Sequence, residues 1–225
     1  MITEFGQIRS LFIEISSLIE EDADIYLIGG GALMYHKSKN LTKDVDIVVR
    51  SEGEFDSVLR SLIKAGFTTM LPDCNTYSRL AISQILVRDE FRIDLFCKTV
   101  CSKFSLSEGM MKRAGMVGQF GRITLHACSV EDIFLFKCMT ERTGDAEDCV
   151  RINYERLLNW NVILEEAVEQ SRVGQGVWIT WITVRLEELE GKGIRVPIMK
   201  EMHNLSDKYI EKWENDLMSR NPDKF

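Results

Sequence analysis

The sequence predicts an α+β fold, in which a mixed sheet with flanking helices is followed by an all-helical C-terminal domain. Two observations lead to this prediction. Short apolar runs bounded by glycine or polar residues, the pattern of strands, occur as far as residue 127, whereas later apolar residues recur at helical spacing. A block of strands followed by a block of helices is typical of an α+β head with a helical tail. We therefore predict a head over residues 1–128 and a helical domain over residues 129–225.

The first half of the predicted head alternates between helices and strands. Apolar residues from Phe5 to Ile19 recur every three or four positions, which indicates an amphipathic helix. Gly66 follows the third predicted helix, at a position where glycine favours helix termination. In order, the predicted elements are a helix over 4–21, a strand over 25–28, a helix over 32–36, a strand over 45–49 and a helix over 54–65.

The rest of the head is predicted from short apolar runs, and the tail from helical periodicity. Ser129 followed by Glu131 and Asp132 is typical of a helix start, because a serine caps the first turn and acidic residues favour it. The remaining elements of the head are strands over 79–83, 85–87, 91–96 and 122–127 and a helix over 107–114. Those of the tail are helices over 130–142, 146–158, 161–173, 177–190 and 204–219.

The composition is that of an ordinary globular protein and argues against several classes. Of the 225 residues, 45% are apolar and 28% are charged, and no apolar run approaches the roughly 20 residues that span a membrane. The N-terminus lacks a basic segment followed by an apolar core, so we expect a cytoplasmic protein. Three histidines, and six cysteines without a C-x-x-C pair, argue against a structural zinc site. The net charge of −7 argues against non-specific nucleic-acid binding, although the basic residues between Lys98 and Arg122 leave a local basic groove open.

Three aspartates occupy apolar strands of the predicted sheet. Asp44 and Asp46 lie at the start of one strand, and side chains at i and i+2 of a strand point to the same face. Asp94 lies inside a second apolar strand, where an ionised carboxylate destabilises the fold unless it is paired or binds a metal. Carboxylate oxygens are ligands that Mg²⁺ prefers. We therefore expect the three carboxylates to converge on two Mg²⁺ ions and a nucleoside triphosphate.

A run of three glycines precedes the aspartates. Gly29 and Gly30 permit positive φ and a close approach of the backbone, so that N–H groups at the start of the following helix can meet a phosphate. Taken alone, a glycine run is more often a flexible turn. Together with three aspartates in strand contexts, it indicates a site for metal and nucleotide.

Three segments carry a resemblance to a known family. They are Ile28-Gly-Gly-Gly-Ala-Leu33, Thr42-Lys-Asp-Val-Asp-Ile47 and Ile93-Asp-Leu95. They resemble the signature of the DNA polymerase beta-like nucleotidyltransferase superfamily, and more closely its small prokaryotic branch of uncharacterised and abortive-infection toxin-like members. The resemblance implies a nucleotidyltransferase-like sheet. It also implies a catalytic and metal-binding set made of Gly29, Gly30, Asp44, Asp46 and Asp94.

A second region extends the resemblance beyond the predicted sheet. In related proteins a helix with a lysine is followed by an R-x-K-D-x-x-D run, which corresponds here to Lys137 and then Arg142, Asp145 and Asp148. The resemblance implies that Lys137, Arg142 and Asp145 contact the nucleotide. The sequence is equally compatible with Lys137 as a surface lysine. The chain departs from the pattern at Gly144, where a lysine is usual.

The predicted function is Mg²⁺-dependent transfer of a nucleoside monophosphate from a nucleoside triphosphate (NTP) to an acceptor hydroxyl, with release of pyrophosphate. The residues leave the acceptor open among tRNA, a protein hydroxyl and a small molecule such as an aminoglycoside. The alternative is a catalytically inactive nucleotide-binding module that acts as a toxin–antitoxin or assembly partner. The helical tail is expected to shape the acceptor site, and it also offers a surface for a second copy or a protein partner.

Overall fold

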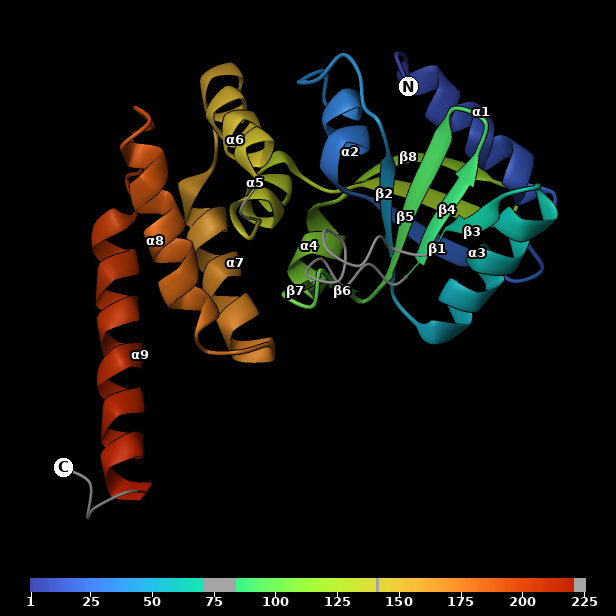
Figure 1. Cartoon of the computed structure of the whole chain (residues 1–225). Coiled ribbons are helices and arrows are strands. Elements are labelled where there is room, and N and C mark those ends of the chain that lie inside the picture. The colour runs from blue at the N-terminus through green and yellow to red at the C-terminus, as the bar shows by residue number, and fades with distance from the viewer. Residues whose placement is uncertain (71–83, 141, 221–225) are drawn as a thin grey trace. The chain divides into compact units, whose positions relative to one another are not determined.

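The computed structural model of the chain describes residues 1–70, 84–140 and 142–220 (Figure 1). The chain divides into two compact units, Met1–Phe136 and Lys137–Phe225. The sequence predicts a division slightly earlier, after residue 128. Among the described helices, none combines the length and the apolar character needed to cross a bilayer.

A mixed sheet forms the centre of the first unit. Among the described residues it has seven strands, in the order β3-β4-β5-β2-β1-β9-β8. β1 pairs with β9 and β2 with β5 in parallel, and the other neighbouring strands are antiparallel, so the predicted mixed sheet is confirmed. The strands are β1 (Ala23–Leu27), β2 (Val45–Val49), β3 (Thr68–Met70), β4 (Gln84–Arg88), β5 (Phe91–Cys97), β8 (Gly115–Phe120) and β9 (Ile123–Ala127). β6 (Thr99–Val100) and β7 (Phe104–Ser105) form a separate small sheet.

The central strand β2 shows why this part of the sequence forms a sheet. Val45, Ile47 and Val49 are fully buried, and their β-branched side chains suit a pleated, packed surface. Successive side chains of a strand point to opposite faces. Asp46 therefore projects from the face opposite to these three residues.

Helices cover the apolar face of the sheet. α1 packs against β8 and β9, α3 packs against β1, β2 and β5, and the two helices touch each other (Figure 1). At Gly31 a Cβ atom would lie 3.4 Å from Ile8 Cδ1 and 3.8 Å from Leu27 Cδ2, so α1 and α2 meet on the Leu27 side of the sheet. Leu27 is in register with Ile47, which places Asp46 on the other side. The helices of this unit are α1 (Phe5–Ser16), α2 (Gly29–Tyr35), α3 (Glu52–Lys64), α4 (Glu108–Arg113) and α5 (Val130–Cys138), whose last residues lie past the division.

The predicted N-cap at Ser129 is confirmed. Its hydroxyl accepts a hydrogen bond from the backbone N–H of Asp132 (3.2 Å) and donates to the carboxylate of the same residue (2.8 Å). The guanidinium of Arg113 donates to that buried carboxylate at 2.6 Å. The cap of α5 is therefore tied to α4 by an ion pair.

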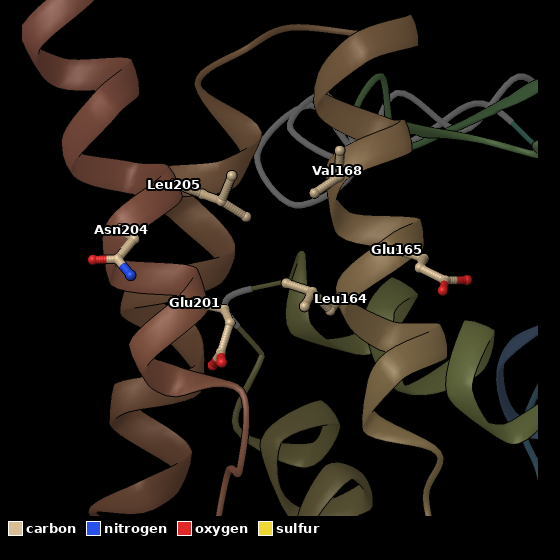
Figure 2. Close-up of a pocket in the computed structure, with 6 residues that line it drawn as sticks. All are labelled: Leu164, Glu165, Val168, Glu201, Asn204 and Leu205. Atoms are coloured by element: carbon tan, nitrogen blue, oxygen red, sulfur yellow. The ribbon is translucent and has the colours of Figure 1, made fainter.

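In the second unit the described elements are helices. α8 packs against α6, α7 and α9, with Ile182 and Leu186 fully buried one turn apart on its inner face. The helices are α6 (Thr143–Glu155), α7 (Trp160–Val173), α8 (Trp178–Glu190) and α9 (Met199–Arg220). A pocket of about 520 Å³ lies between α7 and α9 (Figure 2). It is lined by Leu164, Glu165, Val168, Glu201, Asn204 and Leu205, none of which the sequence proposes as a site residue.

Three predicted helices in the tail have wrong boundaries, of which the one predicted over 146–158 spans Thr143–Glu155, three residues earlier at each end. The helix predicted over 130–142 ends at Cys138, because the amide and the hydroxyl of Thr140 both bond to the carbonyl of Lys137 and turn the chain. The last helix, predicted to begin at residue 204, begins at Met199. The sequence directly after Pro197 has only a weak helical pattern, but burial of residues near the start of α9 stabilises the helix there.

Four strands were not predicted, namely β3, β6, β7 and β8. β8 contains Gly115 and Gly118, which weaken a strand signal, yet it pairs with β9 along most of its length. Pairing with a neighbouring strand thus overrides local propensity there. The strand predicted over 79–83 lies outside the described residues.

Candidate active site

Three carboxylates from two neighbouring strands come together on one face of the sheet. Asp44 directly precedes β2, Asp46 lies within it, and Asp94 lies within β5. β2 and β5 are parallel, with Asp46 and Asp94 directly opposite each other in register. One carboxylate oxygen from each of the three residues lies within 4.8 Å of the others. The convergence that the sequence predicts is therefore present in the structure.

The surroundings of the three carboxylates differ in exposure. Asp44 and Asp46 are half-buried, whereas Asp94 is buried. A cluster of like charges is unfavourable when it is held together without counter-charges. A set of three oxygen donors of this kind suits a hard divalent cation such as Mg²⁺.

The glycines at the start of α2 are fitted closely to the carboxylates. Gly29 has φ of +57°, and a Cβ atom there would lie 2.1 Å from Asp46 Oδ2. At Gly30 a Cβ atom would lie 2.2 Å from Thr42 Oγ1. The backbone N–H of Ile28 donates to the carbonyl of Asp46 at 3.0 Å and fixes this approach. Glycine is therefore required at both positions by neighbouring side chains, and the predicted phosphate contacts remain a proposal.

Thr42 positions the first of the aspartates, a role that the sequence reasoning missed. Its buried hydroxyl donates to the carbonyl of Asp44 at 3.0 Å and lies 3.4 Å from Asp44 Oδ1. Ile2 pairs with Thr42 through two backbone hydrogen bonds of 3.0 Å. The N-terminal segment thereby holds the segment that leads into β2 and the site.

Arg92 is a second neighbour of the carboxylates that the sequence reasoning missed. Its Nε donates to Asp94 Oδ1 at 2.8 Å and a terminal nitrogen donates to Asp94 Oδ2 at 2.9 Å. Both residues lie in β5 at i and i+2, so their side chains share a face. Because side chains two residues apart in a strand share a face, the sequence could have indicated the pair of Arg92 and Asp94 in the same way as the pair of Asp44 and Asp46.

The remaining proposed residues form a cluster in the second unit. Lys137 is buried, and its ammonium lies 2.7 Å from Asp145 Oδ1 and 2.8 Å from Asp148 Oδ2. Arg142 Nε and the hydroxyl of Thr140 both donate to Asp145 Oδ2, at 2.7 and 2.6 Å. The interpretation of Lys137 as a surface lysine is therefore wrong. The described contacts join these residues in one polar network, and contact with a nucleotide stays a prediction.

Charges within this cluster shift each other's proton affinity. Burial alone would lower the pKa of Lys137, but the carboxylates of Asp145 and Asp148 outweigh it, and the pKa is raised. Burial alone would raise the pKa of Asp145, but Lys137, Thr140 and Arg142 outweigh it, and the pKa is lowered. The ion pairs and hydrogen bonds therefore favour the charged forms of both residues at neutral pH.

Comparison with known proteins gives both structural and family matches. A crystal structure of ANT(2'')-Ia in complex with adenylyl-2''-tobramycin is similar to this chain with a TM-score of 0.48 and 13% identity, over 76% of this chain and 98% of that one. A solution structure of the antibiotic-resistance factor ANT(2'')-Ia gives a TM-score of 0.48 and 14% identity, over 75% and 92% of the two chains. No curated protein matches the sequence.

The family match covers most of the chain. The model of the family "Nucleotidyltransferase of unknown function (DUF6036)" matches residues 6–178. This range includes the glycines, all three aspartates and the Lys137 cluster. The chain therefore belongs to this family of nucleotidyltransferases.

Proposed function

We propose that the protein uses Mg²⁺ to transfer a nucleoside monophosphate from an NTP to an acceptor hydroxyl. The observation that carries this proposal is the convergence of Asp44, Asp46 and Asp94, whose ligand atoms lie within 4.8 Å of one another. Membership of a nucleotidyltransferase family supports it. The three residues would act as the metal ligands, and the triphosphate would be the nucleotide donor.

The residues of the site fit a pair of Mg²⁺ ions. The donors are all carboxylate oxygens, and the missing side chain at Gly29 lets the Asp46 carboxylate lie directly against the start of α2. Bound there, Mg²⁺ would neutralise phosphate charge and lower the proton affinity of the acceptor hydroxyl. Asp44 and Asp46 would hold both ions, and Asp94 would contribute to one of them.

The transfer itself needs a nucleophile, a leaving group and a base. The acceptor oxygen forms a bond to the α-phosphorus while the bond to the pyrophosphate oxygen breaks. The hydroxyl proton passes to a base, for which Asp94 is the candidate within the carboxylate cluster. Gly29 and Gly30 would let the backbone approach the phosphates, and the protein would otherwise act mainly by positioning and by electrostatics.

In the second unit, the proposed nucleotide contacts are Lys137, Arg142 and Asp145. Lys137 and Arg142 offer positive charge, and Asp145 holds both of them in place. The guanidinium of Arg142 is 62% exposed and suits a phosphate geometrically. Lys137 and Asp145 are buried, so in addition to their proposed nucleotide contacts they hold Arg142 in place.

The test is an assay for nucleotide transfer with a panel of acceptors. The purified protein is incubated with each labelled NTP, Mg²⁺ and one of three acceptor classes: tRNA, a protein with free serine, threonine or tyrosine hydroxyls, or an aminoglycoside. We expect pyrophosphate release that depends on one acceptor class and on the metal. The acceptor that becomes labelled identifies the substrate class.

A paired set of variants shows whether the carboxylates carry the activity. Asp44→Asn with Asp46→Asn is expected to abolish transfer. The control is Asp22→Asn with Asp89→Asn, which removes the same charge from side chains that are 87% and 79% exposed. Full activity of the Asp44, Asp46 double variant would refute the proposal. Nucleotide binding by the native protein without pyrophosphate release for any acceptor would favour the inactive module instead.

A further inference from the structure

In the part of the chain that the structure describes, Arg92 places a positive charge in a defined position within the carboxylate cluster. Asp46 is in register with Asp94, and Arg92 precedes Asp94 by two residues in β5, so these three side chains lie on one face of the sheet. Asp44, directly before β2, completes the carboxylate cluster.

The contact between Arg92 and Asp94 is a two-point contact. The guanidinium donates to both carboxylate oxygens, at 2.8 and 2.9 Å, which fixes the plane of the carboxylate as well as its position. The side chain of Asp94 is 6% exposed and that of Arg92 is 22% exposed, so the pair is shielded from solvent on most sides. Each carboxylate oxygen carries two lone pairs, so the hydrogen bonds from Arg92 do not by themselves prevent Asp94 from binding a metal.

A lysine could supply the charge of Arg92 but not this geometry. An ammonium is a point charge on a flexible stem, whereas the planar guanidinium matches a carboxylate through two parallel hydrogen bonds. Partners that orient a metal ligand commonly affect activity about 10- to 100-fold when they are replaced.

We propose that Arg92 is a positioning residue that orients the Asp94 carboxylate for nucleotide transfer. The inference rests on the proposed function and assigns to Arg92 a role through Asp94 alone. Arg92 does not bind the triphosphate in this proposal. Its replacement should therefore lower the turnover of bound substrate and leave the affinity for NTP nearly unchanged.

The test compares Arg92→Lys with Arg88→Lys. Arg88 lies in β4 of the same sheet and also makes a two-point contact, with Glu14 of α1 at 2.6 and 2.9 Å. It lies outside the carboxylate cluster, so Arg88→Lys controls for the loss of such a pair as a structural element. For Arg92→Lys we expect kcat to fall about tenfold or more, with KM for NTP within about threefold of the native value. For Arg88→Lys we expect both constants to stay near the native values.

Two outcomes would overturn the inference. One is a native kcat in Arg92→Lys. The other is a rise in KM for NTP with kcat retained, which would mean that Arg92 binds the triphosphate. If Arg92→Lys does not fold, as judged by its melting curve, Arg92→Gln is used with the same expectations. The amide of glutamine cannot make the two parallel hydrogen bonds that the guanidinium makes.

Failure of the inference is distinguishable from failure of the proposed function. If the native protein transfers no nucleotide, or if Asp44→Asn with Asp46→Asn remains active, the proposed function fails regardless of Arg92. If the native protein is active, the aspartate variant is inactive and Arg92→Lys is unchanged, only the role of Arg92 is refuted.

Discussion

Gly29 lies so close to Asp46 that a Cβ atom at residue 29 would be 2.1 Å from Asp46 Oδ2. No side chain fits at this distance, so any substitution must displace the carboxylate or the start of α2. The backbone at Gly29 also has φ of +57°, a conformation that residues with a Cβ atom adopt at some energetic cost. The first helix after β1 and the proposed metal ligand therefore constrain each other.

The first prediction concerns Gly29→Ala. We expect transfer activity to fall at least about 100-fold, because a shift of about 1 Å in a catalytic group can have that effect. The control is Gly66→Ala, which has φ of +89° but would place its Cβ 3.6 Å from Arg88 Cδ, an ordinary contact. Both variants strain the backbone, and only Gly29→Ala displaces Asp46. Equal activity of the two variants would show that the close fit to Asp46 is irrelevant.

Much of this site could be predicted because strand periodicity is local. β2 spans Val45–Val49 as predicted, and the alternation of side chains places Asp44 and Asp46 on one face. The sequence also indicates Asp94 as a site residue, because a carboxylate in an apolar strand needs a partner. The structure supplies one such partner in Arg92, two residues away in the same strand.

What the sequence could not predict depends on contacts between distant segments. The pairing of Ile2 with Thr42 joins the N-terminus to the segment before β2, and no local sequence pattern predicts this pairing. The burial of Lys137 follows from two aspartates on the next helix, whereas its own helix would equally suit a surface lysine. Strand β8 is held by its partner β9 despite its glycines.

The second prediction concerns metal binding without turnover. Saturating Mn²⁺, a common substitute for Mg²⁺ at oxygen sites, should raise the free energy of unfolding of the native protein by about 1–3 kcal/mol. Asp44→Asn with Asp46→Asn should show no such increase. Without metal, this variant should be at least as stable as the native protein, because two like charges near Asp94 are removed. Thermal unfolding with Mn²⁺ and with a chelator measures both effects.

The third prediction concerns the nucleotide contacts proposed for the second unit. Arg142→Ala should raise KM for NTP about tenfold, the effect of losing one charge-assisted contact. Arg172→Ala is the matched control, because Arg172 is 69% exposed, lies in the same unit and pairs with Glu169. Steady-state kinetics with each NTP and a fixed acceptor would separate the two. Identical KM values for the two variants would remove Arg142 from the nucleotide site.

The last prediction concerns the pH dependence of the Lys137 cluster. The pKa of Asp145 is lowered in the folded state, so its stabilising contribution is present above its usual pKa of 3.8 and is lost as pH falls through the folded value. The pKa of Lys137 is raised, so its contribution is present below its usual value of 10.5 and is lost as pH rises through the folded value. The cluster should therefore stabilise the second unit fully between about pH 4 and pH 10.

Asp145→Asn tests the acid side of this window. At pH 7 the free energy of unfolding of the variant should be about 2 kcal/mol lower than that of the native protein. The reason is that the variant loses hydrogen bonds to a charged carboxylate, including the one from the buried ammonium of Lys137. Urea unfolding followed by circular dichroism at pH 7, 5 and 3 measures the difference from the native protein. The difference should be the same at pH 7 and pH 5 and smaller at pH 3, because below pH 3.8 the unfolded native chain takes up a proton at Asp145 and the stabilising contribution of the folded carboxylate falls. Asp207→Asn, an exposed aspartate of α9, should show little difference at any of these pH values. A difference for Asp145→Asn that does not shrink at pH 3 would mean that the charge of Asp145 does not stabilise the cluster.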